Sequence, residues 1–219
     1  MILIKEYPNT KAMIFDLDGT LLDSMSLWHD VDRKYLANYG IEYKRKYSED
    51  IKGLTFHQTA LYFIENFNIP LDAEEIKNQW NEMVEIEYRD HIMCKDGVYE
   101  FLEVLNRHNI KMCIATSCNK KHAQMALKRL KIDDYFLFIH TSDEAGRNKE
   151  YSDIFCQCAE MMDVCVEDCF VVEDLYSAIK VAHNAKFKTI AMYEDHQKDQ
   201  IERIHDISNY YVKSFKELL

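Results

Sequence analysis

Apolar residues are spaced in two different ways along this chain of 219 residues. A short apolar run ends at Phe15, and after it apolar side chains recur every three or four residues as far as about residue 91. That spacing places them on one face of an α-helix. It predicts helices over residues 28–38, 55–66 and 73–89, whose aromatic residues are expected to pack into a core.

From residue 95 onward the pattern changes, because short apolar runs alternate with helical segments. The runs predict strands over residues 111–115, 136–140, 169–172 and 189–192, and the segments around them predict helices over residues 98–107, 121–130, 152–162 and 175–184. Such alternation is typical of a parallel sheet with helices on both faces. We therefore predict an α/β fold, a Rossmann-like doubly wound parallel sheet formed by residues 1–24 and 93–219, with an inserted α-helical cap domain at residues 25–92.

Composition mainly argues against nucleic-acid binding, a membrane span and a zinc ribbon. Lys and Arg number 27 against 38 Asp and Glu, a formal charge of −11 that disfavours nucleic acid. No run of 18 apolar residues predicts a membrane span, and the first residues lack the features of a signal peptide. The seven cysteines lack the CxxC pairs of a zinc ribbon. We expect a cytoplasmic protein, and a monomer.

Side chains suited to phosphate chemistry follow the predicted strands. They are Asp16 and Asp18 after the first strand, Thr116 and Ser117 after the second, Lys149 at the start of the helix after the third, and Glu173 and Asp174 after the fourth. Because the carboxyl ends of parallel strands lie along one edge of the sheet, these groups are expected to converge there. Neighbouring carboxylates repel each other unless a cation compensates, and Mg²⁺ binds carboxylates together with water and a substrate phosphate.

These segments resemble the haloacid dehalogenase superfamily, and in particular its helical-cap members that are similar to the β-phosphoglucomutase-like phosphatases. Four segments carry the resemblance: Phe15-Asp16-Leu17-Asp18-Gly19-Thr20-Leu21-Leu22-Asp23-Ser24, Ile114-Ala115-Thr116-Ser117, Asn148-Lys149 with Asp153-Ile154-Phe155, and Val171-Val172-Glu173-Asp174. The third departs from the family pattern, because the prolines that usually follow the lysine are missing.

The resemblance implies a role for each matching residue. Asp16 would attack phosphorus as the nucleophile, Asp18 would act as the acid and base, and Thr116 and Lys149 would hold the phosphoryl oxygens. Mg²⁺ would be bound by Asp16, Asp18 through its backbone carbonyl, Glu173 and Asp174. Substrate would be contacted by Ser117 and, in the cap, by Gly53, Leu54 and Thr55. The sequence assigns no role to Lys52, Phe56 or His57.

The function expected from this resemblance is that of a Mg²⁺-dependent phosphatase, a phosphoric monoester hydrolase acting on a small phosphorylated metabolite such as a sugar phosphate. One alternative is a phosphomutase of the β-phosphoglucomutase type, although the arginine that such enzymes carry near the position of Phe56 is missing. A second alternative, suggested by the altered third segment, is a catalytically silent module that binds a ligand or regulates a partner.

Overall fold

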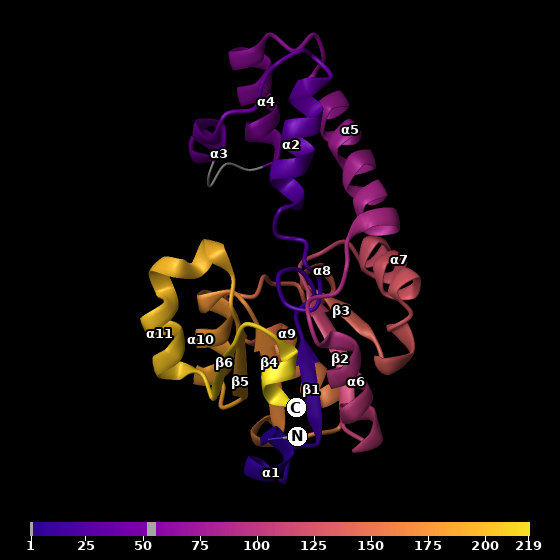
Figure 1. The fold of residues 1–219 in the computed structure, drawn as a ribbon, viewed down its shortest axis with the longest axis vertical. Helices are drawn as coiled ribbons and strands as arrows, with labels where there is room; N and C mark the ends of the chain where they lie inside the picture. Colours follow the sequence, from indigo (N-terminus) through magenta and orange to yellow (C-terminus); the bar gives the residue numbers. More distant parts are fainter. Residues whose placement is uncertain (1, 52–55) are drawn as a thin grey trace. The chain divides into compact units, whose positions relative to one another are not determined.

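The computed structural model describes residues 2–51 and 56–219, and the chain forms two compact units. The first comprises Met1–Ser24 and Ile92–Leu219, and we call it the catalytic unit; the second comprises Met25–His91, and we call it the helical unit (Figure 1). Among the described residues, no helix has the length and apolar character needed to cross a bilayer.

The catalytic unit is built on a sheet in which, within the described residues, six strands run parallel in the order β3-β2-β1-β4-β5-β6. The strands are β1 (Ala12–Phe15), β2 (Lys111–Thr116), β3 (Ile139–Thr141), β4 (Cys169–Glu173), β5 (Lys188–Met192) and β6 (Tyr210–Val212). The expected Rossmann-like parallel sheet is confirmed. Strand β1 lies between β2 and β4, and all four of its residues are buried, as expected for a strand covered on both faces.

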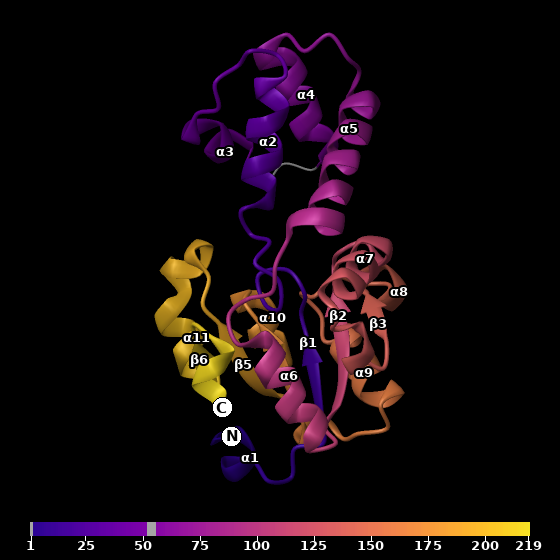
Figure 2. The ribbon, with the colours of Figure 1, turned by 45° about the vertical axis from the view of Figure 1, so that its right-hand side comes forward.

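Helices cover both faces of this sheet (Figure 2). They are α1 (Ile2–Glu6), α6 (Val98–Arg107), α7 (Lys120–Leu130), α8 (Ser142–Ala145), α9 (Asp153–Met161), α10 (Tyr176–Asn184) and α11 (Ile201–Ile207), with short helical turns η2 (Asp133–Tyr135), η3 (Val166–Asp168), η4 (Asp195–Gln200) and η5 (Phe215–Leu218). Helices α9 and α10 pack on one face, where Ile14 contacts the same core as Phe155. On the other face Phe15, Phe101 of α6 and Phe215 of η5 stack against one another.

One expected strand differs from the structure, and two observed elements were not expected. The third strand begins at Ile139 instead of residue 136, because the preceding segment turns through η2. Before Ile139, the Leu137 N–H donates to the carbonyl of Met112 and the Ile114 N–H donates to the carbonyl of Phe138. Residues 201–207 and 210–212, for which no element was predicted, form α11 and the edge strand β6. Such short edge elements bury few residues, so their apolar pattern is weak.

The helical unit contains α2 (Leu27–Ala37), α3 (Arg45–Ile51), α4 (Phe56–Phe67), α5 (Ala73–Ile86) and the π-helical turn η1 (Glu87–His91). Asp72 is the N-cap of helix α5: its side chain accepts a hydrogen bond from the Glu75 N–H, and the Glu75 side chain accepts one from the Asp72 N–H. The core is aromatic: Tyr35, Phe63 and Trp80 are each almost fully buried, with ring centroids 5.1–6.1 Å apart. Helical spacing of these residues thus gives the packed core that it predicts.

The chain leaves the catalytic unit and returns to it at neighbouring points. Leu22 and Cys94 form an antiparallel bridge, the Asp23 N–H donates to Met93 at 2.9 Å, and the Lys95 N–H donates to the carbonyl of Leu21 at 2.9 Å. The two ends of the inserted segment are therefore joined by backbone hydrogen bonds within the catalytic unit.

Candidate active site

The turn after β1 carries the two aspartates of the first motif. The Asp16 N–H donates to the carbonyl of Val172 at 2.9 Å, so strand pairing with β4 continues to this residue. The chain then turns at Gly19, which has a φ of +78° that suits glycine, and the Gly19 N–H donates to the carbonyl of Leu22 at 3.0 Å. The turn thereby fixes Asp18 directly beyond the carboxyl end of the central strand.

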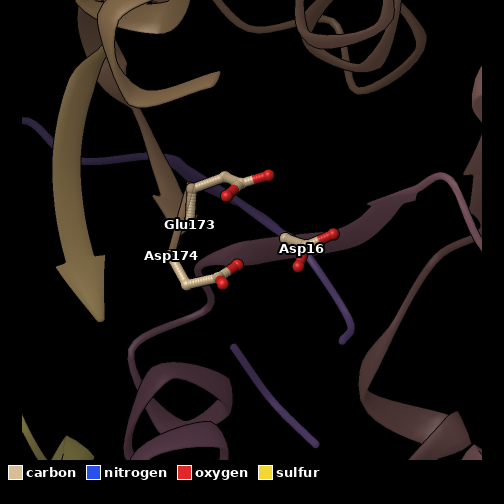
Figure 3. A group of neighbouring side chains, drawn as sticks. All are labelled: Asp16, Glu173 and Asp174. Atoms are coloured by element: carbon tan, nitrogen blue, oxygen red, sulfur yellow. The ribbon is translucent and has the colours of Figure 1, made fainter. Parts of the chain in front are cut away.

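Three carboxylates meet at this edge of the sheet (Figure 3). Asp16 follows β1, Glu173 is the last residue of β4, and Asp174 comes next in the chain. One oxygen from each lies within 4.8 Å of the others, and all three residues are buried. The register of the sheet explains the meeting, since Phe15 pairs with Val172 and the two strands end side by side.

Lys149 provides the positive charge next to these carboxylates. Its ammonium group donates to Asp16 Oδ1 and, at 3.0 Å, to Glu173 Oε1, and the side chain is 8% exposed. It lies in a turn between α8 and α9, so the expectation that Lys149 opens a helix was wrong: α9 begins only at Asp153. The side chain of Asn148 accepts from the Glu150 N–H, a local turn that takes the place of the missing prolines.

Burial governs the ionisation of this cluster. Burial raises the pKa of Asp16 to about 7; Lys149 opposes this shift and Glu173 adds to it. Burial likewise raises the pKa of Glu173, although the backbone N–H of Leu175, 2.7 Å from Oε2, favours its charged form. For Lys149, the two carboxylates outweigh burial and raise the pKa above its usual range.

These residues fit a divalent cation. Asp16, Glu173 and Asp174 in their ionised forms carry three negative charges, and Lys149 supplies one positive charge, so about two negative charges are left among buried side chains. Carboxylate oxygens are the ligands that hard cations such as Mg²⁺ prefer, and a buried charge of this size requires compensation. The donor set is therefore suited to a divalent metal, without selecting among the hard cations.

Two hydroxyl groups that sequence reasoning passed over support the aspartates. Ser24 Oγ donates to Asp18 Oδ1 at 2.7 Å, and Thr20 Oγ1 donates to Asp174 Oδ1 at 3.4 Å. Ser24 and Thr20 both belong to the first motif. The sequence does not show which carboxylates they bond to, because the turn after β1 brings the hydroxyl groups close to these carboxylates. The Asp18 side chain is not part of the three-carboxylate group.

The other expected site residues either make contacts outside the three-carboxylate group or lie outside the described residues. Thr116 ends β2, beside β1, and is buried, with its hydroxyl accepting from the Cys118 N–H at 3.0 Å. Ser117 is exposed, and its hydroxyl shares a hydrogen bond of 2.9 Å with Ser142 at the start of α8. The predicted contacts of the cap with substrate concern Gly53, Leu54 and Thr55, which lie outside the described residues, as do Lys52 and the side chain of Phe56. His57 is described and exposed, with its ring 3.7 Å from Glu74.

Comparison with known proteins identifies the fold and its chemistry. A family model described as haloacid dehalogenase-like hydrolase matches residues 13–192. The chain belongs to this family. The match spans the strand before Asp16, the helical unit and the strand after Asp174, so all four motif segments of this haloacid dehalogenase-like hydrolase lie inside it.

Individual relatives cover most of the chain. A phosphorylated carbohydrates phosphatase from Thermotoga maritima is 27% identical over 82% of this chain and 83% of its own length. A β-phosphoglucomutase from Bacillus subtilis is 29% identical over 80% of each. Among solved structures, a candidate β-phosphoglucomutase from Thermotoga maritima superimposes with a TM-score of 0.85, at 25% identity, over 96% of this chain and 97% of its own. The similarity to these helical-cap proteins therefore extends over both units.

Proposed function

We propose that this hydrolase is a Mg²⁺-dependent phosphatase that cleaves a small phosphorylated metabolite through an aspartyl-phosphate on Asp16. The observation that supports the proposal most strongly is the buried group of Asp16, Glu173 and Asp174 with Lys149 bonded to two of its members. Relatives named as phosphatases of phosphorylated carbohydrates support the same reaction class.

In the first half of the proposed reaction, a carboxylate oxygen of Asp16 attacks the phosphorus atom of the monoester. The new O–P bond forms as the bond from phosphorus to the substrate oxygen breaks, and Asp18 gives its proton to that leaving oxygen. Ser24 holds the carboxyl group of Asp18 by one oxygen, so the proton is presented from the other. The products of this half are the dephosphorylated alcohol and an acyl phosphate on Asp16.

In the second half, a water molecule attacks the phosphorus of the acyl phosphate, and Asp18 accepts its proton. The bond between phosphorus and Asp16 breaks, which frees phosphate and restores the carboxylate. Lys149 and Thr116 would hold the non-bridging oxygens during both displacements, where positioning and charge supply most of the catalysis. A bound Mg²⁺, held by Asp16, Glu173, Asp174 and the carbonyl of Asp18, would neutralise the phosphate so that the anionic nucleophile can approach.

A phosphomutase is the second candidate, because the Bacillus subtilis β-phosphoglucomutase is similar along most of the chain. It would use the same acyl phosphate but return the phosphoryl group to a second hydroxyl of the sugar. Incubation of a sugar phosphate with a bisphosphate activator separates the two candidates: free phosphate favours the phosphatase, and an isomerised sugar phosphate favours the mutase. The expected monomeric state and cytoplasmic location remain predictions from the sequence.

The test measures phosphate release with Mg²⁺ over a panel of sugar, polyol and nucleoside phosphates. The Asp16→Asn variant should lose at least about 10³-fold in kcat on every substrate, because the amide is a poor nucleophile. Asp134→Asn, which changes an exposed carboxylate of the same unit, is the matched control and should keep parental rates. An Asp16→Asn protein that releases phosphate as fast as the parent would refute the proposal.

A further inference from the structure

A buried ion pair joins Lys95 to Glu194 within the catalytic unit. Lys95 belongs to the segment that re-enters this unit, and Glu194 lies two positions beyond the end of β5. Their side chains are only 11% and 13% exposed. The Lys95 ammonium group also donates to the carbonyl of Tyr193 at 3.3 Å. The re-entering segment is therefore attached by its side chain to the loop after β5.

The next residue of the same segment shows the ordinary arrangement. Asp96 lies 2.6 Å from the ammonium group of Lys216, but the two side chains are 60% and 55% exposed. A solvated pair of this kind contributes little to stability. The pair of Lys95 and Glu194 is mostly removed from water, and attraction between buried charges often fails to offset the cost of removing them. Stability alone therefore does not explain this pair, whereas a need to fix the two segments in one arrangement does.

Main-chain hydrogen bonds extend this arrangement to the turn after β1. The Lys95 N–H donates to the carbonyl of Leu21 at 2.9 Å, so the position of Lys95 determines that of the turn. At the other end, the Tyr193 N–H donates to the carbonyl of Val212 at 2.8 Å, which attaches the loop after β5 to β6. Because β4 lies between β1 and β5, the ion pair connects the loops on either side of the strand that ends in Glu173.

The turn after β1 in its side contacts one of the three buried carboxylates. Thr20, next to Leu21, is fully buried, and its hydroxyl donates to Asp174 Oδ1 at 3.4 Å. This distance is long for a hydroxyl donor, so a small shift of the turn breaks the bond. Asp174, one of the carboxylates in Figure 3, is itself only 1% exposed. Because Mg²⁺ demands near-ideal octahedral geometry, the orientation of such a carboxylate affects how tightly the ion binds.

We propose that Lys95 and Glu194 are positioning residues for the metal site, because their ion pair holds the turn after β1 where Thr20 orients Asp174. The inference rests on the proposed function, since it takes Asp174 as a metal ligand. The pair acts through the turn and not by contact with metal or substrate. It therefore changes the affinity for Mg²⁺ and leaves the chemical step of the metal-loaded protein unchanged.

The test removes both charges together. Lys95→Met with Glu194→Gln leaves the formal charge of the unit unchanged, so altered long-range electrostatics cannot explain a change in Mg²⁺ affinity. Isothermal titration calorimetry of the substrate-free protein should show a Kd for Mg²⁺ raised about 3- to 10-fold, the equivalent of one hydrogen bond. At saturating Mg²⁺, kcat should change less than about twofold. Lys95→Arg, which keeps the ion pair, should keep the parental Kd.

Two further variants show where the effect arises. Thr20→Val removes the hydroxyl group that donates to Asp174, so it should raise the Kd for Mg²⁺ by a similar factor. Added to Thr20→Val, the two substitutions at Lys95 and Glu194 should raise the Kd less than about twofold further, because both act through the same hydrogen bond. Asp96→Asn with Lys216→Met removes the exposed pair and is the matched control, which should keep the parental Kd and kcat.

Three results would overturn the inference: a parental Kd in the folded double variant, an effect that adds in full to that of Thr20→Val, and a loss of kcat that saturating Mg²⁺ does not restore. Should the double variant not fold, Lys95→Gln with Glu194→Gln takes its place and should raise the Kd at least about twofold, and a parental Kd there refutes the inference. A parent that binds no Mg²⁺ refutes it as well. A parent that binds Mg²⁺ but hydrolyses no ester contradicts the proposed function alone, and the comparison of Kd values still decides the role of the pair.

Discussion

Replacing Asp32 by asparagine should change the pH dependence of stability in the ligand-free protein. The pKa of Asp32 is raised by burial from an ordinary value of 3.8 to about 7. Because the folded value is the higher one, the native state holds this proton over a range of pH in which the unfolded chain has lost it. Stability from this group is therefore fully present below pH 3.8 and is lost as the pH rises through about 7.

The size of the effect follows from the shift. A difference of about 3 pKa units corresponds to about 4 kcal/mol lost by the parent at alkaline pH, at about 1.4 kcal/mol for each unit. At pH 5 the parent has lost only about 1.6 kcal/mol of this stability. Its free energy of unfolding should therefore fall by about 3 kcal/mol between pH 5 and pH 8 through this group. Asparagine cannot ionise, and its own burial cost is the same at both values. The free energy of unfolding of Asp32→Asn relative to the parent should thus rise by about 3 kcal/mol between pH 5 and pH 8.

Urea unfolding followed by tryptophan fluorescence measures this stability difference in the helical unit. Both tryptophans of the chain, Trp28 and Trp80, belong to the helical unit, so their emission reports on the unit that contains Asp32. Asp30→Asn should show no comparable dependence on pH, because that carboxylate is exposed. A stability difference for Asp32→Asn that is the same at pH 5 and pH 8 would refute the reasoning.

Two further substitutions test the catalytic unit. Lys149→Met leaves the carboxylates of Asp16 and Glu173 buried without their cation, so it should destabilise the metal-free protein by about 3–5 kcal/mol and lower kcat by about 10²–10³-fold. Mg²⁺ should then raise its thermal unfolding midpoint more than that of the parent, and equal shifts would contradict this account. Gly97→Ala should cost at least about 2 kcal/mol by urea unfolding, because φ is +81° and a Cβ would lie 2.6 Å from the Lys216 nitrogen. Gly146→Ala, at φ +77° with nothing within 4 Å, should cost about 1 kcal/mol, so similar losses in both would show that contact with Lys216 is unimportant.

The sequence predicted the architecture because its strongest signals are periodic. The apolar run before Asp16 marks a strand covered on both faces, and helical spacing over residues 98–107 predicts α6 with its observed limits. Convergence of Asp16, Glu173 and Asp174 followed from the parallel sheet alone. Four predicted strand ends were enough to indicate which side chains would share one edge.

Details set by tertiary contacts were not predictable in this way. The turn that carries Lys149 depends on the side chain of Asn148 and not on helical periodicity, so the expectation that Lys149 opens a helix was wrong, although the helix predicted over residues 152–162 matches α9 to within one residue at each end. The bond from Ser24 to Asp18 requires the turn at Gly19 to close. The burial of Asp32 is the clearest case, because an aspartate in a helix is usually exposed and only packing shows otherwise.

The bridge between Leu22 and Cys94 joins the two chain segments that lead into and out of the inserted helical unit. Its two ends are tied together before the chain reaches the helices, so a change in the length or composition of residues 25–91 need not move the strand that delivers Asp16. The same framework could accordingly carry a very different inserted segment, with the apparatus for phosphate chemistry unaltered and only the choice of molecule changed.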